Sequence, residues 1–164
     1  MIIRKAGEKD LEAINRIYNQ AVELKATADT VPVGMENRRE WFSRHDPAFY
    51  PVFVSETNEQ VSGWLSFSPY RPGRHALRYT AEISYYVDRS FHKTGIGTSL
   101  VCFAIENAPQ YHFRNLFAII LETNAGSIRL MEKCGLGKWG FLPCIADFEG
   151  EVCGQVYYGL NLNP

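Results

Sequence analysis

The sequence predicts an α+β fold in which helices flank a mixed, mostly antiparallel central sheet. Apolar residues make up 46% and charged residues 21% of the 164 residues, which is typical of a globular protein with a packed core. Strand-like segments are unevenly mixed with helical ones, and this order favours a mixed sheet over regular βα alternation. We expect one domain over residues 1–164, because a chain of this length fills a single core.

The first half of the chain predicts a short strand, two helices and a hairpin. Apolar residues from Leu11 to Val22 recur at helical spacing, and Asp10 precedes them as a candidate cap. The expected elements are a strand at 2–3, a helix after Asp10, a polar loop over 26–33, a helix over 36–44, and strands over 52–55 and 61–67 joined by a turn at 57–59.

The second half predicts the remaining strands and two more helices. Leu116–Leu121 is a continuous apolar run, which is typical of a strand buried on both faces. Gly135 is suited to end a short helix. The expected elements are a loop over 68–75, a strand over 80–87, a helix over 95–107, a strand over 116–121, a helix over 127–133, and strands over 139–142 and 152–160. In strand 80–87 we expect Ile83, Tyr85 and Val87 on one face, and Ala81, Ser84 and Tyr86 near the other.

Charge and cysteine usage exclude several functional classes. A net charge of -1 gives no reason to expect nucleic acid or an anionic membrane as a partner. No apolar run approaches the roughly 20 residues that span a bilayer, and the first residues do not resemble a signal peptide. The four cysteines are not at metal-ligand spacing, so we expect reduced thiols in a cytoplasmic protein without a metal site: Cys102, Cys134, Cys144 and Cys153.

The most informative segment is a strand that runs through a short polar turn into a glycine-rich helix start. His92-Lys93-Thr94-Gly95-Ile96-Gly97 opens this helix. Consecutive amides at a helix N-terminus can hold a pyrophosphate, and glycines let the backbone approach a ligand. The spacing differs from a P-loop and from the dinucleotide fingerprint, because residue 100 is Leu. A tight turn with close helix packing is the structural alternative.

This segment resembles the acetyl-CoA site of the GNAT N-acetyltransferases, whose signature is Gln/Arg-x-x-Gly-x-Gly/Ala. His92 stands where Gln or Arg is usual. Asn124-Ala125-Gly126-Ser127, with Gly135 after it, is similar to a second family block. The resemblance implies the GNAT acyl-CoA N-acyltransferase fold, acetyl-CoA as co-substrate, and these binding residues: Tyr85, Tyr86, Val87, His92, Lys93, Thr94, Gly95, Ile96, Gly97, Thr98, Asn124 and Ser127.

Further markers narrow the resemblance to the phosphinothricin and methionine sulfoximine acetyltransferases. They are Ile17-Tyr18-Asn19, Trp41-Phe42 and Thr80-Ala81-Glu82. The resemblance implies a homodimer that transfers acetyl directly to the amine of a small amino-acid-like molecule, with Glu82 as general base. An apolar strand would raise the pKa of this carboxyl toward a working value. The alternative is a sheet-edge carboxylate paired with an arginine.

Other roles stay more open. Backbone N–H groups near Tyr86 and Val87 would polarise the thioester carbonyl, and Asn124 either binds the pantetheine arm, caps a helix, or does both. Met131 stands where many relatives have the Tyr that protonates the thiolate, so this acid is unassigned. By resemblance the substrate carboxylate meets Arg71, Leu77 and Arg78; a solvated basic loop is the alternative. Polar residues 27–30 are further candidates.

Two other functions remain open at this level. The same fold can acetylate a peptide N-terminus or a polyamine, although arginines before the central strand oppose a cationic substrate. The alternative from a different functional class is a CoA-binding module that does not catalyse a reaction. Met131 favours that module, and Glu82 opposes it.

Overall fold

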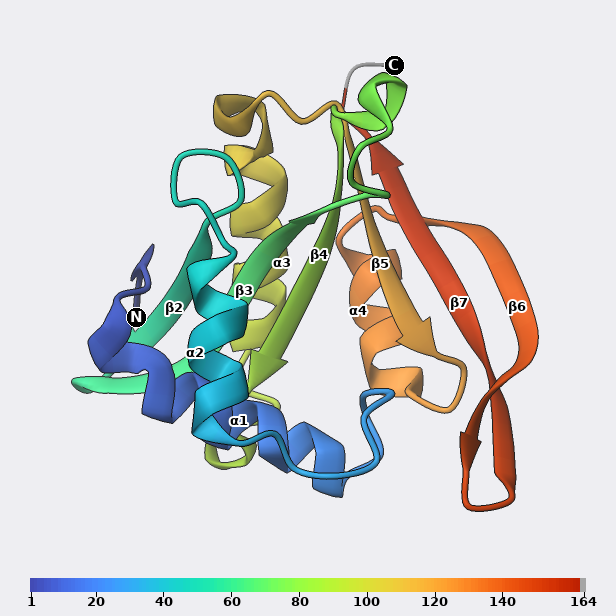
Figure 1. Cartoon of the computed structure of the whole chain (residues 1–164), viewed down its shortest axis with the longest axis horizontal. Helices are drawn as coiled ribbons and strands as arrows, with labels where there is room; N and C mark the ends of the chain where they lie inside the picture. The colour runs from blue at the N-terminus through green and yellow to red at the C-terminus, as the bar shows by residue number, and fades with distance from the viewer. Residues whose placement is uncertain (163–164) are drawn as a thin grey trace.

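The computed structural model describes residues 1–162, in which a seven-stranded sheet carries helices on both faces (Figure 1). The strand order is β1-β2-β3-β4-β5-β7-β6, and every neighbouring pair is antiparallel except β4 and β5. The predicted fold class and the predicted order of strands and α-helices are confirmed. The predicted domain also includes residues 163–164, which lie outside the described residues.

The elements have the following bounds. The strands are β1 (Ile2–Lys5), β2 (Val52–Thr57), β3 (Gln60–Pro69), β4 (Thr80–Val87), β5 (Asn115–Leu121), β6 (Gly137–Phe148) and β7 (Glu151–Asn161). The α-helices are α1 (Leu11–Glu23), α2 (Met35–Ser43), α3 (Ile96–Asn107) and α4 (Ala125–Lys133). Short 3-10 helices are η1 (Glu8–Asp10), η2 (His75–Leu77), η3 (Arg89–Phe91) and η4 (Ala108–Tyr111). None of the described helices combines the length and apolarity that crossing a membrane requires.

Two boundaries differ clearly from the prediction. Helix α4 begins at Ala125 rather than residue 127, because Asn124 is its N-cap and accepts the Ser127 N–H through Oδ1 at 3.1 Å. Strand β6 is much longer than predicted and extends to Phe148. Pro143 argues against a long strand in the sequence, because proline lacks the N–H that a sheet requires. In the structure Pro143 lies where the β6–β7 register shifts, between Leu142 and Ala146, so it interrupts little pairing.

The two faces of the sheet have separate cores. Helices α3 and α4 cover one face around Leu65, Ile83 and Leu100, while α1 and α2 cover the other around Ile14 and Trp64. Ala81 is fully buried in the first core together with Ile83. Its predicted place on the opposite face is therefore wrong, because strand alternation puts all odd-numbered residues of β4 together.

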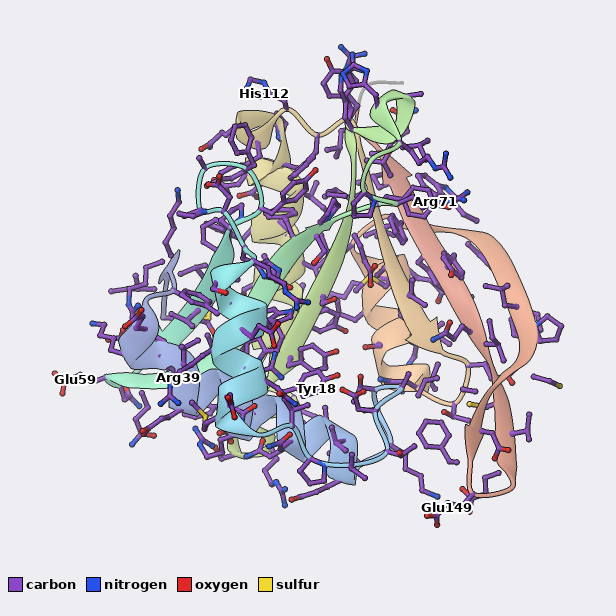
Figure 2. All side chains as sticks on the ribbon, viewed as in Figure 1. Tyr18, Arg39, Glu59, Arg71, His112 and Glu149 are labelled. Atoms are coloured by element: carbon purple, nitrogen blue, oxygen red, sulfur yellow. The ribbon has the colours of Figure 1, made fainter. Side chains whose placement is uncertain are left out.

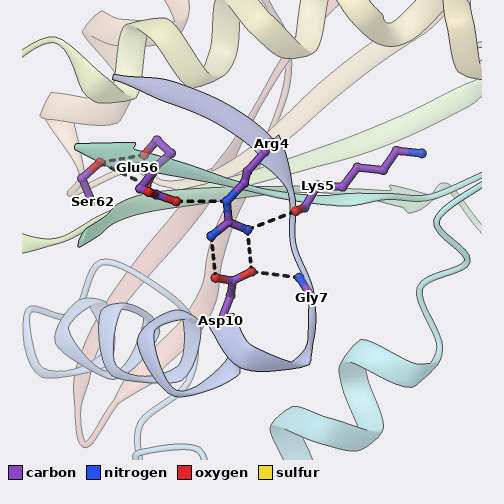
Figure 3. A network of polar contacts seen from close by, with 7 residues as sticks. Arg4, Lys5, Gly7, Asp10, Glu56 and Ser62 are labelled. Carbon is purple, nitrogen blue, oxygen red and sulfur yellow. Dashed lines mark hydrogen bonds and ion pairs between the residues drawn. The ribbon is translucent and has the colours of Figure 1, made fainter. Parts of the chain in front are cut away.

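An ionic network fixes the start of α1 (Figure 3). The Asp10 carboxylate makes no cap to the helix. Instead it accepts two hydrogen bonds of 2.8 Å from Arg4 and one of 2.9 Å from the Gly7 N–H, while Arg4 Nε reaches Glu56 at 3.0 Å. Burial opposes ionisation of Asp10, but these bonds outweigh it and lower its pKa. The network ties β1 and β2 to the helix that carries Tyr18 to the site.

Candidate active site

The site forms where the only parallel strand pair of the described sheet separates. Strands β4 and β5 pair over Thr80–Asn115, Ala81–Leu116 and Glu82–Phe117, and no further. Both strands continue beyond this point, β4 to Val87 and β5 to Leu121. Figure 1 shows them diverging toward the end of the sheet near α1 and α4. The gap leaves one edge of β4 without a strand partner.

Backbone groups of β4 point into this gap in a regular alternation. At both ends, even-numbered residues bond to β3: Thr80 O accepts the Tyr70 N–H at 3.4 Å, and the Asp88 N–H donates to Ser62 O at 2.9 Å. The β3–β4 register has no bulge, so the odd positions face the gap. The sequence suggested the backbone N–H groups near Tyr86 and Val87 as donors to the thioester. The Tyr86 N–H faces β3 instead of the gap. The N–H groups that face the gap beyond the last β4–β5 pair belong to Tyr85 and Val87.

A large cavity of about 930 Å³ lies against the gap and the start of α3. Its wall includes nearly all of the residues predicted to bind acetyl-CoA: Tyr85, Tyr86, Val87, His92, Lys93, Gly95, Ile96, Gly97, Thr98, Asn124 and Ser127. Thr94 is the exception, and its hydroxyl donates to Phe91 O at 2.6 Å. The first intrahelical bond of α3 runs from Ser99 N–H to Gly95 O. The preceding amides of this helix therefore lack helical acceptors and face a ligand site.

The two signature glycines are required for different reasons. Gly95 has φ +91°, a left-handed conformation that strains other residues, and open space surrounds it. Gly97 has an ordinary conformation, but a Cβ there would lie 2.8 Å from Leu130 Cδ1 and 3.3 Å from Tyr85 Cε2. Gly95 shapes the turn, whereas Gly97 lets α3 pack closely on α4 and β4.

His92, which replaces the Gln or Arg of the signature, stabilises the turn before α3. Its Nε2 lies 3.0 Å from Val87 O, and because a carbonyl only accepts, the ring nitrogen is the donor. The Lys93 backbone has φ +62°, and its side chain lines the cavity and is exposed to solvent. The turn thus presents a positive charge beside the free amides.

A hydroxyl pair lies across the same cavity. Tyr85 Oη and Ser127 Oγ are 2.6 Å apart, which joins β4 to the start of α4. Burial raises the pKa of Tyr85 to about 12, although the Ser127 hydrogen bond opposes the shift. Met131 is fully buried in the core, and its thioether has no proton to donate, so this position in α4 offers no acid. Asn124 caps the same helix through Oδ1, as one of its two expected roles required.

Glu82 lines a second cavity of about 380 Å³, on the face of the sheet covered by α1 and α2. Burial raises the pKa of this carboxyl. No ion pair of residues 1–162 involves Glu82, so the structure does not show the alternative arginine pairing. The two cavities share Ser84 and Tyr86 of β4, Ile119 of β5 and Ala26. They therefore meet at the gap between the strands.

The loop arginines lie elsewhere. Arg71, Leu77 and Arg78 line neither cavity. Arg78 donates to His75 O at 2.9 Å and stacks on the Tyr79 ring, with Cζ 4.1 Å from the centroid. Figure 2 shows Arg71 on the outer side of the molecule. Their role in substrate binding stays a prediction, which requires that this loop moves or serves the site of another copy.

The second cavity also contains residues that the sequence reasoning missed. Arg38 and Trp64 line it, together with Thr27 and Asp29 from the polar stretch that was a candidate. Helical spacing carries a signal for Arg38, because it lies three residues from both Met35 and Trp41 and so shares their inner face. Trp64 offered no such signal, since an indole in an apolar strand is typical of a core.

This fold and site define an N-acetyltransferase. The family model "Acetyltransferase (GNAT) family" matches residues 11–136, and the chain belongs to this family. YwnH of Bacillus subtilis, a candidate phosphinothricin acetyltransferase, is 40% identical over 92% of this chain and 93% of its own length. The L-methionine sulfoximine/L-methionine sulfone acetyltransferase of Pseudomonas paraeruginosa is 34% identical over 99% of this chain and 95% of its own.

A solved relative agrees in three dimensions. The crystal structure of a GNAT superfamily phosphinothricin acetyltransferase from Sinorhizobium meliloti, in complex with acetyl-CoA, has a TM-score of 0.91 and 25% identity. The match covers 98% of this chain and 87% of that one. The predicted resemblance to the phosphinothricin and methionine sulfoximine acetyltransferases is therefore confirmed at the level of family and subgroup.

Proposed function

We propose that this enzyme transfers acetyl directly from acetyl-CoA to the α-amine of a small amino-acid-like molecule. The observation that carries the proposal is the position of Glu82. Its carboxyl lies at the vertex of the strand gap, in the cavity on the α1–α2 face, while the larger cavity meets the same gap. An amine entering from one side and a thioester entering from the other would meet beside it.

The large cavity suits acetyl-CoA, which supplies the acetyl group as a thioester when bound. The amides of Ile96, Gly97 and Thr98 and the charge of Lys93 would hold the pyrophosphate. A Cβ at Gly97 would fill space against Leu130, so the glycine keeps the cradle narrow. The exposed edge of β4 offers backbone groups to the amide-containing arm.

Three groups of this chain would carry out the chemistry. Glu82 accepts a proton from the ammonium group, directly or through one water, because a free amine is the nucleophile. The Val87 N–H, which faces the gap, stabilises negative charge that develops on the carbonyl oxygen. The Tyr85–Ser127 hydroxyl pair protonates the departing thiolate, since Met131 cannot.

The amino-acid substrate is supported by the relatives' names and by the small second cavity. A peptide N-terminus, a polyamine or a CoA-binding module without turnover are the competing functions. We also propose a homodimer, supported by exposed apolar residues on the edge strand β6, among them Trp139, Phe141 and Ile145. Cytoplasmic location is supported by Cys102 and Cys134, whose sulfurs lie 4.0 Å apart as free thiols and form no disulfide in the described structure.

The test measures CoA release at fixed acetyl-CoA with phosphinothricin, methionine sulfoximine, methionine sulfone, ordinary amino acids, spermidine and a short peptide. We expect release with the sulfoximine-type compounds, and a loss of about 100-fold or more in kcat for Glu82→Gln. Glu59→Gln is the matched control, because Glu59 is exposed at an outer edge of the molecule (Figure 2) and lines neither cavity. CoA release with spermidine alone or with the peptide alone would show that the substrate is a polyamine or a peptide, not an amino-acid-like molecule. Near-normal turnover of Glu82→Gln would exclude Glu82 as the general base.

A further inference from the structure

Arg38 is a buried cation that makes no ion pair within residues 1–162, and Asp29 is the anion that acts on it across the cavity. Only 4% of the residue is exposed. Its Nε donates to Asn15 Oδ1 at 3.1 Å, and within residues 1–162 no hydrogen bond or ion pair involves its two Nη atoms. Burial lowers its pKa, which reflects the cost of keeping this charge away from water. Buried charges are normally paired.

Aromatic rings hold the guanidinium in one place. Its Cζ lies 4.5 Å from the Tyr18 ring centroid and 4.7 Å from that of Trp41, with Trp64 at 5.8 Å. This stacking fixes the planar group without using its terminal N–H donors. Arg38 lines the second cavity, so those donors remain available there to a molecule that enters it.

A second donor of the same wall lacks an acceptor. Trp64 is 1% exposed and lines this cavity, and its Nε1 has no hydrogen-bond partner in the described structure. Buried polar groups without partners are rare in native proteins. The residues that line the cavity therefore include two with unpaired donors, Arg38 and the buried Nε1 of Trp64, while acceptors lie at Glu82 and Asp29.

We propose that Arg38, assisted by Trp64 Nε1, binds the α-carboxylate of the substrate, an inference that rests on the proposed amino-acid N-acetylation. A zwitterionic amino acid matches the cavity, because its ammonium group suits Glu82 and its carboxylate suits the guanidinium. A carboxylate compensates the buried charge, which a neutral sulfone oxygen does not. The exposed Arg71 and Arg78 already have water as a partner and line neither cavity.

The experiment compares methionine sulfone with its carboxamide, which keeps the amine and removes the negative charge. CoA release gives kcat/KM for both compounds with the wild type, Arg38→Met, Arg38→Lys, Trp64→Phe, Arg71→Gln and Arg78→Gln. We expect the wild type to prefer the acid by on the order of 100-fold. Arg38→Met should bring that ratio below about 3, Arg38→Lys should give an intermediate ratio, and Trp64→Phe should reduce it by several fold.

The ratio separates recognition from folding, because a merely structural loss lowers both rates together. The affinity of Arg38→Met for acetyl-CoA, measured by calorimetry, should equal that of the wild type. An unchanged affinity would show that the variant is folded. An unchanged acid-to-amide ratio in Arg38→Met overturns the proposal, whatever the absolute rate. A ratio that collapses in Arg71→Gln or Arg78→Gln instead also overturns it.

Binding measured without turnover distinguishes this inference from the proposed function. Calorimetric titration of the wild type and Arg38→Met with both compounds reports carboxylate recognition directly. Arg38-dependent binding of the acid without CoA release would support the subsite and refute the acetylation of this compound. Absence of both binding and release would refute the subsite for amino acids of this class.

Discussion

Glu82 and Phe117 form the last pair of the β4–β5 ladder, so the candidate base lies at the point where the sheet opens. This relationship couples a structural event to a chemical one. The same residue ends the pairing and borders the cavity in which the amine would bind. Burial there raises the carboxyl pKa above its ordinary value, which brings it nearer to that of a useful base.

The first prediction concerns the pH dependence of kcat/KM. A carboxyl group can act as a base only when it is ionised, and burial raises the pKa of Glu82. Activity should therefore fall on the acidic side through a pKa above the value of about 4.3 that an exposed Glu has. Glu82→Gln should remove this limb and leave a shallow rise that follows the free amine of the substrate. A wild-type limb that persists unchanged in Glu82→Gln would assign it to another group.

The second prediction separates the two glycines of the α3 turn. Gly95→Ala should destabilise the protein by about 1 kcal/mol or more through its left-handed φ. Gly97→Ala meets Leu130 and Tyr85 instead, so it should mainly raise KM for acetyl-CoA by moving α3. Urea unfolding and initial rates measure the two effects. Gly137→Ala, in open space on β6, is the control. Equal effects of both substitutions on KM would contradict the distinction.

The third prediction tests the hydroxyl pair as proton donor. Tyr85 has a pKa of about 12 and keeps its proton at neutral pH. Tyr85→Phe should lower kcat by roughly 10- to 100-fold with little change in the affinity for acetyl-CoA. Ser127→Ala, which removes the 2.6 Å partner, should cause a smaller loss. If Tyr85→Phe leaves kcat intact, the thiolate takes its proton from water.

The fourth prediction concerns stability in acid. Burial alone would raise the pKa of Asp88, but hydrogen bonds from Ser90 and the ion pair with Arg16 lower it to about 2. The native carboxylate thus adds stability above its unfolded pKa of about 3.9, and this contribution is lost as the pH falls toward 2. Asp88→Asn should lower the free energy of unfolding at pH 7 by about 1–2 kcal/mol.

The measurement for Asp88 is urea unfolding at pH 7 and at successive values below 4. The difference between wild type and Asp88→Asn should shrink as the pH falls through this window. A difference that stays constant would mean that the amide disturbs the turn by its shape, not by its charge.

Sequence patterns predicted much of this fold because they depend on local chemistry. The apolar run of β5 and the Gly95–Gly97 helix start each depend on residues adjacent in the sequence, and both occur where expected. Arg38 could not be found in this way, since its burial depends on rings contributed by α1, α2 and β3. The length of β6 was likewise missed, because its pairing with β7 outweighs the local effect of Pro143.

The meeting of two cavities at one strand gap has a consequence for how such an enzyme can diversify. The cavity proposed for acetyl-CoA is lined by α3, α4, the glycine turn and the end of α1, whereas the cavity proposed for the amine is lined by α2, Tyr18 of α1 and the loop that holds Asp29. Only a few residues, such as Tyr86, belong to both. Under the proposed assignment, substitutions around the amine cavity would exchange one amine for another while most residues around the acetyl-CoA cavity stay unchanged.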